Sequence, residues 1–318
     1  MDIFTDIVDT LRVRGVLYFR TRFTSPWSVQ VPAYRKVARF HLITGGRSWV
    51  RISGEPTPTL IQEGDLILIP QGNAHILSDS PDRPPLDVDD VVRQTGFTGS
   101  GTLVYSAADS DGEARGEFVT MVCGHLEFDD GFTHPLLADL PSHILVRSSE
   151  SLNHTWLAGA LRFITRETQS EFSGADAVVK RLSEIFFIQV ARAYLDTVGE
   201  DLRFIAALKD PQLAKALTAL HAEPGRDWTV ESLAQTAGLS RARFAARFQQ
   251  MVGRAPIAYL TQWRMLKAAQ MLRQTEKPIK TIARGMGYRT EQTFSRAFSQ
   301  HFMQPPQNYR SSYLVSSP

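Results

Sequence analysis

The sequence predicts an α+β fold in which a jelly-roll β-barrel, a helical connector and an all-α C-terminal domain follow one another. Three observations support this order. They are strand-like alternation within residues 37–79, two amphipathic stretches between residues 153 and 197, and a helix-turn-helix pattern that occurs twice after residue 226. A length of 318 residues is sufficient for two domains and a connector. We place these parts at residues 1–146, 147–208 and 209–318.

Charge is distributed unevenly between the two ends of the chain. Residues 210–318 carry 15 Lys and Arg against 6 Asp and Glu, a balance of +9, whereas residues 1–209 carry 20 against 27, a balance of −7. A basic domain joined to an acidic one indicates that the C-terminal end meets a polyanion. Chance scatter of surface charge is the alternative, and only motifs can decide between the two.

Cysteine content and hydropathy indicate the cellular compartment. Cys123 is the single cysteine, which excludes an intramolecular disulfide and is typical of a reducing cytosol. No apolar run reaches the roughly 18 residues of a membrane span. Asp2, Asp6 and Asp9 give the first residues the wrong charge for a signal peptide. We therefore expect a cytoplasmic protein with no membrane partner.

The acidic half reads as β structure. Residues 37–43, 48–52 and 66–69 are the clearest strands, and glycine-containing turns separate them. Residues 80–116 are rich in Asp, Gly, Ser and Pro, so we expect a long loop there. Such a loop is either a lid over the mouth of the barrel or an insertion without a role.

One set of turn residues resembles the second motif of the cupin family. The matching residues are Gly64, Pro70, Gly72, His75 and Asp79, with Asp in the place usually held by Asn. The resemblance implies a cupin (jelly-roll) β-barrel with the histidine directed toward its mouth.

The first cupin motif, which supplies two His and a Glu in the metal-dependent enzymes, has no counterpart. Ala38 or Arg39 stands where the Glu is expected, and no His-x-His precedes it. A cupin-type metalloenzyme fused to a DNA-binding domain is thus the alternative that this sequence disfavours. We expect no enzyme activity and assign no catalytic residues.

Two helices are predicted between the domains, over residues 153–168 and 174–197. In the second, Val178, Leu182, Ile185, Phe186, Gln189 and Tyr194 lie near one stripe. Such a stripe either packs on the barrel or forms a dimer interface. Asp210 and Pro211 then start a further helix, and residues 221–226 are expected to form the loop after it.

A helix-turn-helix pattern begins at Thr229, which can cap a helix that ends at Gly238. A second helix starts at Ser240 and carries Phe244 and Phe248 on one face. About fifty residues later the pattern recurs in Ile282, Ala283, Gly287, Phe294 and Phe298, and residues 256–273 read as a long connecting helix. Such a duplication can place two recognition helices in successive major grooves.

Residues 226–310 resemble the DNA-binding domain of the AraC/XylS family of bacterial regulators. The strongest match includes Gly287–Tyr288, Pro305–Pro306 and Tyr309–Arg310, whereas Met303 or Gln304 stands where the family often has Gly. Residues 15–146 are similar to the effector-binding barrel of one branch of that family. The resemblance implies a regulator that binds double-stranded DNA, acts as a homodimer, and contacts RNA polymerase if it is an activator.

Helix geometry predicts which side chains face DNA, because the phenylalanines of each recognition helix face the core. The predicted contacts on the first helix are Ser240, Arg241, Ala242, Arg243, Ala246 and Arg247. Those on the second are Arg289, Thr290, Glu291, Gln292, Thr293, Ser295 and Arg296. Arg, Gln and Glu can read guanine, adenine and cytosine, whereas any of the arginines can instead bind phosphate alone. Small alanines make strong base readout by the first helix doubtful.

The effector candidates in the barrel are His41, His75, Cys123 and His125. Part of the similar family branch senses oxidants or metals through such residues, and Thr21 stands where that branch has a second cysteine. Zinc or copper is one alternative, with His125, His134, water or a ligand completing the site. An organic small-molecule effector is the second, and a purely structural set of core side chains is the third.

Overall fold

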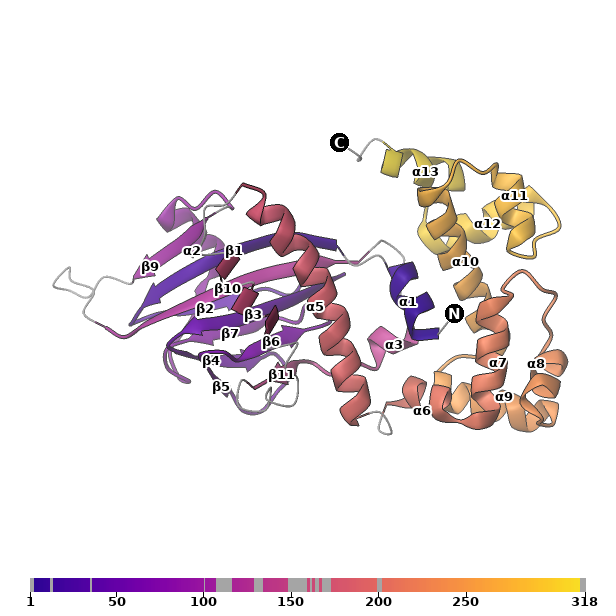
Figure 1. Cartoon of the computed structure of the whole chain (residues 1–318), viewed down its shortest axis with the longest axis horizontal. Coiled ribbons are helices and arrows are strands. Elements are labelled where there is room, and N and C mark those ends of the chain that lie inside the picture. Colours follow the sequence, from indigo (N-terminus) through magenta and orange to yellow (C-terminus); the bar gives the residue numbers. More distant parts are fainter. Residues whose placement is uncertain are drawn as a thin grey trace. The chain divides into compact units, whose positions relative to one another are not determined.

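The computed structural model of the chain separates into two compact units (Figure 1). One unit contains residues 13–128 and 140–197, and the other contains residues 1–12, 129–139 and 198–318. These units interleave along the chain, whereas the three predicted domains are consecutive stretches and stay a prediction. The structure describes residues 3–11, 14–34, 36–99, 101–106, 116–128, 134–147, 159–160, 162–163, 166–167, 173–198 and 202–314.

The first unit contains two sheets, and each is mostly antiparallel. The larger has the order β11-β6-β3-β10-β1-β9, with β1 (Arg14–Thr24), β3 (Val37–Gly45), β6 (Leu66–Ile69), β9 (Thr102–Ser106), β10 (Phe118–Glu127) and β11 (Ile144–Val146). The smaller has the order β5-β4-β7-β2-β8, with β2 (Ser28–Val31), β4 (Arg47–Ile52), β5 (Thr59–Gln62), β7 (His75–Ser78) and β8 (Leu86–Asp87). The three strands predicted most clearly are confirmed as β3, β4 and β6.

A shared apolar core joins the inner faces of the two sheets. Phe23 and Met121 from the larger sheet pack in one cluster with Val29, Val50 and Leu77 from the smaller one. The sheets are not joined by hydrogen bonds into a closed barrel among the described strands. The predicted barrel is therefore corrected to an open two-sheet sandwich, in which side-chain burial rather than a continuous hydrogen-bonded ring holds the layers together.

The segment predicted as a long loop is partly regular. It contains β8, the helix α2 (Val88–Thr95) and β9, so the loop prediction for residues 80–116 is wrong over these elements. Asp87 caps α2 by accepting a hydrogen bond from the Asp89 amide, and Gly96 ends the helix in the left-handed conformation. Short polar residues that suggested a loop thus act here as helix caps.

The helix α5 (Ala175–Val198) confirms the second connector helix and belongs to the sandwich unit. Val179, Phe186 and Phe187 are buried, and the Phe187 ring lies 5.5 Å from that of Phe128. Ile185 on another face is 55% exposed. One part of the predicted stripe therefore packs within the unit and another part remains open. The other predicted helix, over residues 153–168, lies mostly outside the described residues.

The second unit is helical. Its described helices are α1 (Ile3–Leu11), α3 (Pro135–Ala138), α6 (Arg203–Lys209), α7 (Pro211–Ala222), α8 (Val230–Ala237), α9 (Arg241–Val252), α10 (Pro256–Gln274), α11 (Ile279–Gly285), α12 (Glu291–Phe302) and α13 (Pro306–Leu314). The pairs α8–α9 and α11–α12 are the two predicted helix-turn-helix units, and α10 is the predicted long helix between them. In the described part of the chain, no helix is long and apolar enough to cross a membrane.

A buried polar relay joins α1 and α3 to the helical unit. The Tyr259 hydroxyl lies 2.7 Å from Nε2 of His221 and 3.0 Å from Nε2 of His134, and Nδ1 of His221 lies 3.2 Å from the Asp6 carboxylate. The Lys267 ammonium donates to the other Asp6 oxygen at 3.0 Å. With both histidines neutral, every donor in this relay faces an acceptor. His221, predicted to begin a loop, lies within α7, which continues to Ala222.

Candidate functional site

A cavity of about 450 Å³ lies within the sandwich unit. Its walls come from β1, β2, β3, β7, β9 and β10, together with α2 and the segment that follows it. Most of the lining is apolar and includes Phe19, Phe23, Val29, Leu77, Phe97, Leu103 and Met121. The ring of Phe97, which follows α2, lies 5.3 Å from that of Phe19 on β1. Part of the segment considered as a lid is therefore a wall of this cavity.

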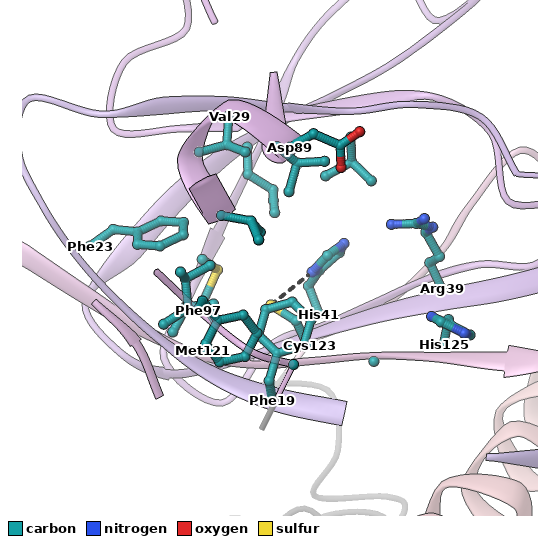
Figure 2. A pocket seen from close by; sticks show the side chains of 18 of the residues that line it. Phe19, Phe23, Val29, Arg39, His41, Asp89, Phe97, Met121, Cys123 and His125 are labelled. Carbon is teal, nitrogen blue, oxygen red and sulfur yellow. Dashed lines mark hydrogen bonds between the residues drawn. The ribbon is translucent and has the colours of Figure 1, made fainter. Parts of the chain in front are cut away.

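One side of the cavity is polar. Figure 2 shows Arg39 and His125 on the side opposite Phe23, with His41 and Cys123 between them. Because side chains alternate along a strand, Arg39 and His41 project from the same face of β3. The Arg39 guanidinium carbon lies 4.3 Å from the centre of the Tyr34 ring, and burial lowers the pKa of this arginine. The cavity therefore has an apolar body and a cationic end.

The histidines and the cysteine form a linear hydrogen-bonded relay. Strand register places Cys123 of β10 opposite His41 of β3, and Nδ1 of His41 lies 3.1 Å from the Cys123 sulfur. Nε2 of His41 lies 2.8 Å from Nε2 of His75, and Nδ1 of His75 lies 2.9 Å from the Asn73 carbonyl. Neutral rings satisfy all of these contacts when the thiol donates to His41, His41 donates to His75, and His75 donates to Asn73.

Burial fixes the protonation of this relay. It lowers the pKa of His75 to about 4 and that of His41 well below its usual value, so both rings are neutral near pH 7. Burial also raises the pKa of the Cys123 thiol to about 12. A thiol held in its protonated form is a weak nucleophile and a slow target for oxidants.

A metal does not fit the relay as it is arranged. His41 contacts Cys123 and His75 through opposite nitrogens of its ring, so the three side chains do not converge on one point. Within the part of the chain that the structure describes, no three His, Cys, Asp or Glu side chains are grouped as metal ligands. His134, considered as a further ligand, instead lies in the helical unit against Tyr259.

The first recognition helix, α9, begins with Ser240 as its cap. Arg241, Ala242, Arg243 and Ala246 are exposed, while Phe244 and Phe248 are buried. Arg241 forms an exposed ion pair of 3.3 Å with Glu231. The predicted outward face of α9 thus has two exposed arginines, Arg241 and Arg243, and its other exposed side chains are short.

Arg247 differs from its neighbours on α9. Its guanidinium bonds the carboxylate of Asp210 and, at 3.3 Å, the side chain of Gln212. Asp210 is buried and also caps α7 by accepting hydrogen bonds from the amides of Gln212 and Leu213. Arg247 therefore uses much of its hydrogen-bonding capacity within the unit, unlike Arg243 and Arg296 in the described part of the chain.

The second recognition helix, α12, presents a polar face. Thr290 caps it by accepting a hydrogen bond from the Thr293 amide at 3.2 Å. The exposed residues at or near its start are Arg289, Thr290, Glu291, Gln292, Thr293 and Arg296, and Ser295 is half-buried. This face carries the amide, carboxylate and guanidinium groups that can pair with base edges.

Comparison with known proteins decides the family. Residues 2–196 match the family described as Cupin, and residues 233–312 match the family described as Helix-turn-helix domain. The transcriptional regulator AlkR of Acinetobacter baylyi is 33% identical over 98% of this chain and 99% of its own length. An AraC-like transcription regulator of Streptomyces lividans is 31% identical over 98% of each chain. The chain belongs to the AraC family of transcription regulators.

This AraC-family chain is a DNA-binding transcription regulator with an N-terminal cupin-like ligand-binding domain, as the sequence predicted. It is also 30% identical to the RCS-specific transcriptional activator RclR of Escherichia coli, over 86% of this chain and 84% of that protein. Among solved structures, the DNA-binding domain of AdpA in complex with a target DNA matches 34% of this chain and 97% of that one. Its sequence identity is 28% and its TM-score is 0.32.

The sequence reasoning missed most of the ligand cavity of this AraC-family regulator. It named His41, Cys123 and His125, which do line the cavity, together with His75, which lies behind His41. It noted Arg39 only as a residue that is not Glu. The alternation of β3, which puts Arg39 on the same face as His41, is the signal that identifies it. No comparable signal marks Phe97, because it follows a helix that was not predicted.

Proposed function

We propose that an organic molecule bound in the sandwich cavity controls DNA binding by this regulator. The observation that carries the proposal is the cavity itself, which has a volume of about 450 Å³ and is lined mainly by apolar side chains with a few polar groups. Sites for small organic ligands have this size and composition. Binding in such a site, rather than catalysis, is the role we assign to the domain.

The relay of Cys123, His41 and His75 supports an organic effector over an oxidant or a metal. Cys123 is 4% exposed, and burial raises the pKa of its thiol to about 12. An oxidant sensor needs an accessible thiolate, and a metal sensor needs ligands that converge. In our proposal the relay is a satisfied polar element of the cavity wall that fixes the orientation of His41.

Chain connectivity offers a route from the cavity to the DNA-binding unit. β1 and β10 both line the cavity, β1 directly follows α1, and β10 is followed by α3. Both short helices belong to the helical unit, where the Tyr259 relay holds them. A ligand that favours one arrangement of β1 and β10 can thereby bias the helical unit, provided that it binds the two arrangements with different affinity.

The proposed regulator acts in the cytoplasm as a homodimer, and contacts RNA polymerase where it activates transcription. Val178 and Ile185, on the open part of α5, are 36% and 55% exposed and support a second copy as the partner of this helix. Two copies would bind repeated half-sites more tightly than one. Sedimentation of the protein with Ile185→Glu tests the dimer, which is expected to dissociate.

The proposal is tested by filling the cavity. Small acids, alcohols and amines are screened by thermal shift, and stabilising compounds are added to gel shifts on DNA selected by the protein from a random pool. Met121→Trp, which occupies the cavity, is expected to abolish both effects, whereas Val104→Trp on the exposed face of β9 retains them. In the parent protein we expect DNA affinity to change by about fivefold or more.

Two results would contradict the proposal. One is a ligand response that is equal in Met121→Trp and the parent. The other is near-stoichiometric zinc or copper in protein purified under reducing conditions, lost in both His75→Ala and Cys123→Ser. The second result would instead make the domain a metal sensor.

A further inference from the structure

The apolar part of the cavity sets the body of its ligand. Phe19, Phe23, Phe97 and Met121 enclose it, and the cluster around them contains Trp27, whose ring lies 5.0 Å from that of Phe23. A volume of about 450 Å³ in such surroundings accommodates an aliphatic chain or one to two aromatic rings. A ligand that is entirely apolar, however, would leave the polar side of the cavity without a complementary group.

Arg39 is the group that lacks a complement. Its Nε atom is buried and has no hydrogen-bond partner in the described part of the chain. No carboxylate among the described residues forms an ion pair with this arginine; Tyr34 contacts it through the face of the ring and through a side-chain hydrogen bond. A half-buried cation with no anion beside it is unfavourable, so the cavity favours a ligand that supplies one.

The remaining polar groups near the cavity do not cancel this charge. Burial lowers the pKa of His41 and of His125, so both rings are neutral near pH 7. Asp89 is the acidic residue of the lining, but it lies on α2 and is exposed to water. In Figure 2 no hydrogen bond is drawn between Asp89 and Arg39.

We infer that the effector is an amphipathic anion, whose carboxylate pairs with Arg39 and whose apolar body lies among Phe19, Phe97 and Met121. This inference rests on the proposed function, because it names the chemical class of the ligand for the same cavity. A guanidinium edge binds a carboxylate through two parallel hydrogen bonds, and the unpaired Nε of Arg39 leaves such an edge open.

Two matched series of compounds test the head group. The first is decanoate, decan-1-ol and decylamine; the second is 4-phenylbutyrate, 4-phenylbutan-1-ol and 4-phenylbutylamine. Binding is measured by calorimetry and by the fluorescence of the parent protein, below the micelle concentration. We expect the carboxylate of at least one series to bind about tenfold or more tightly than its alcohol, and the amine to bind most weakly.

Arg39→Gln is expected to remove the preference for the carboxylate while leaving the affinity for the alcohol within about twofold. Arg47→Gln, an exposed arginine of β4 outside the cavity, is the matched control and keeps the preference. Circular dichroism and melting temperature show that both variants fold. Unchanged alcohol binding in Arg39→Gln shows, in addition, that its cavity is intact.

The outcomes separate the head group from the proposed function. Equal binding of acid and alcohol, unaffected by Arg39→Gln, would overturn the anionic head group and leave an organic effector in place. Preferential binding of the amines would also overturn it and would point to Asp89. If no member of either series binds the parent protein, the inference is wrong. If the parent protein shows no ligand response and contains bound metal, the proposed function itself is wrong.

Discussion

The two helix-turn-helix units repeat one another at an interval of fifty residues, yet they differ where they face outward. Phe244 and Phe294, Phe248 and Phe298, and Tyr259 and Tyr309 occupy matching buried positions. The exposed positions do not match: Ala242 corresponds to Gln292, and Ala246 corresponds to Arg296. The core of each unit has thus kept one pattern while the surfaces have diverged.

This difference suggests a division of labour between the two helices. α12 carries long polar side chains that can pair with base edges, whereas α9 offers mainly Arg241 and Arg243 among short alanines. Base pairs are distinguished by side chains that reach into the groove, while phosphate contacts give affinity without sequence preference. We therefore expect α12 to distinguish base pairs and α9 to contact mainly the phosphate groups of DNA.

The largest expected difference between the two helix-turn-helix units is the change in their stability at acid pH. Tyr259 faces His134 and His221, whose pKa values burial lowers, while the Tyr309 hydroxyl faces Arg273. A histidine with a folded-state pKa below its unfolded value stabilises the fold fully above about pH 6.5 and loses that contribution as the pH falls. Between the folded-state pKa and about pH 6.5, each of these two histidines lowers the free energy of unfolding by up to about 1.4 kcal/mol for every unit by which the pH falls.

Hydrogen exchange of α7 and α10 between pH 7.5 and 5, corrected for intrinsic rates, measures this loss. His221→Gln is expected to flatten the pH dependence, and Arg273→Gln in the second unit is expected to leave it unchanged. An unaltered slope in His221→Gln would show that this relay does not set the acid sensitivity.

Base readout is the next largest effect. Gln292→Ala and Arg296→Ala are each expected to lower affinity for selected DNA by about 1–3 kcal/mol and to relax the preference at one position. Arg243→Ala on α9 is expected to weaken binding to all sequences alike and to reduce the salt slope by about 0.9. Competition titrations at several salt concentrations measure both. Loss of sequence preference in Arg243→Ala would reverse the assignment of the two helices.

A smaller effect concerns the ion pair between Asp210 and Arg247 in the first helix-turn-helix unit, because Ala297 stands at the position of the second unit that matches Arg247. Asp210→Asn retains a capping side chain but removes the charge opposite Arg247. We therefore expect the free energy of unfolding, measured with urea, to fall by about 1–2 kcal/mol. Solvent screens this pair in part, because the Arg247 side chain is 36% exposed. Glu231→Gln, which breaks the exposed pair with Arg241, is the control and is expected to change stability by less than about 0.5 kcal/mol. Equal effects would mean that burial of Asp210 adds nothing.

The smallest expected effect lies in the turns that end the two recognition helices. Gly253 and Met303 both adopt left-handed backbone, with φ of 76° and 58°. A residue with a Cβ is strained there, so Met303→Gly is expected to stabilise the unit by about 0.5–1 kcal/mol. Gly253→Ala is expected to destabilise it by a similar amount. Thermal denaturation measures both, and a lower melting temperature for Met303→Gly would show that the 87% exposed Met303 side chain contributes unnoticed packing.

Local patterns predicted much of the fold. Alternation identified β3, β4 and β6, and caps such as Thr229 and Gly238 identified the ends of α8. These features are encoded within a few residues, because a strand face or a helix cap depends on near neighbours. The double helix-turn-helix could be predicted for the same reason, and its duplication doubled the signal.

Long-range contacts could not be predicted in this way. The contact between His221 and Asp6 spans 215 residues, and the one between His134 and Tyr259 spans 125. Nothing near Asp6 indicates that α1 belongs with the helical unit. Likewise Arg247 pairs with a residue 37 positions earlier in the chain. The pattern of its own helix predicted only that it faces outward and did not indicate this partner.

The place of α1 in the helical unit bears on how such proteins exchange parts. A gene fragment that begins near residue 209 encodes both helix-turn-helix units but omits Asp6, the acceptor for Lys267 and His221, and omits His134 beside Tyr259. Recombination with another sensor would therefore leave the half-buried Lys267 and the buried His221 without Asp6. Transfer of the DNA-binding domain of this regulator therefore also requires the two segments that contain Asp6 and His134, so a single crossover is not enough.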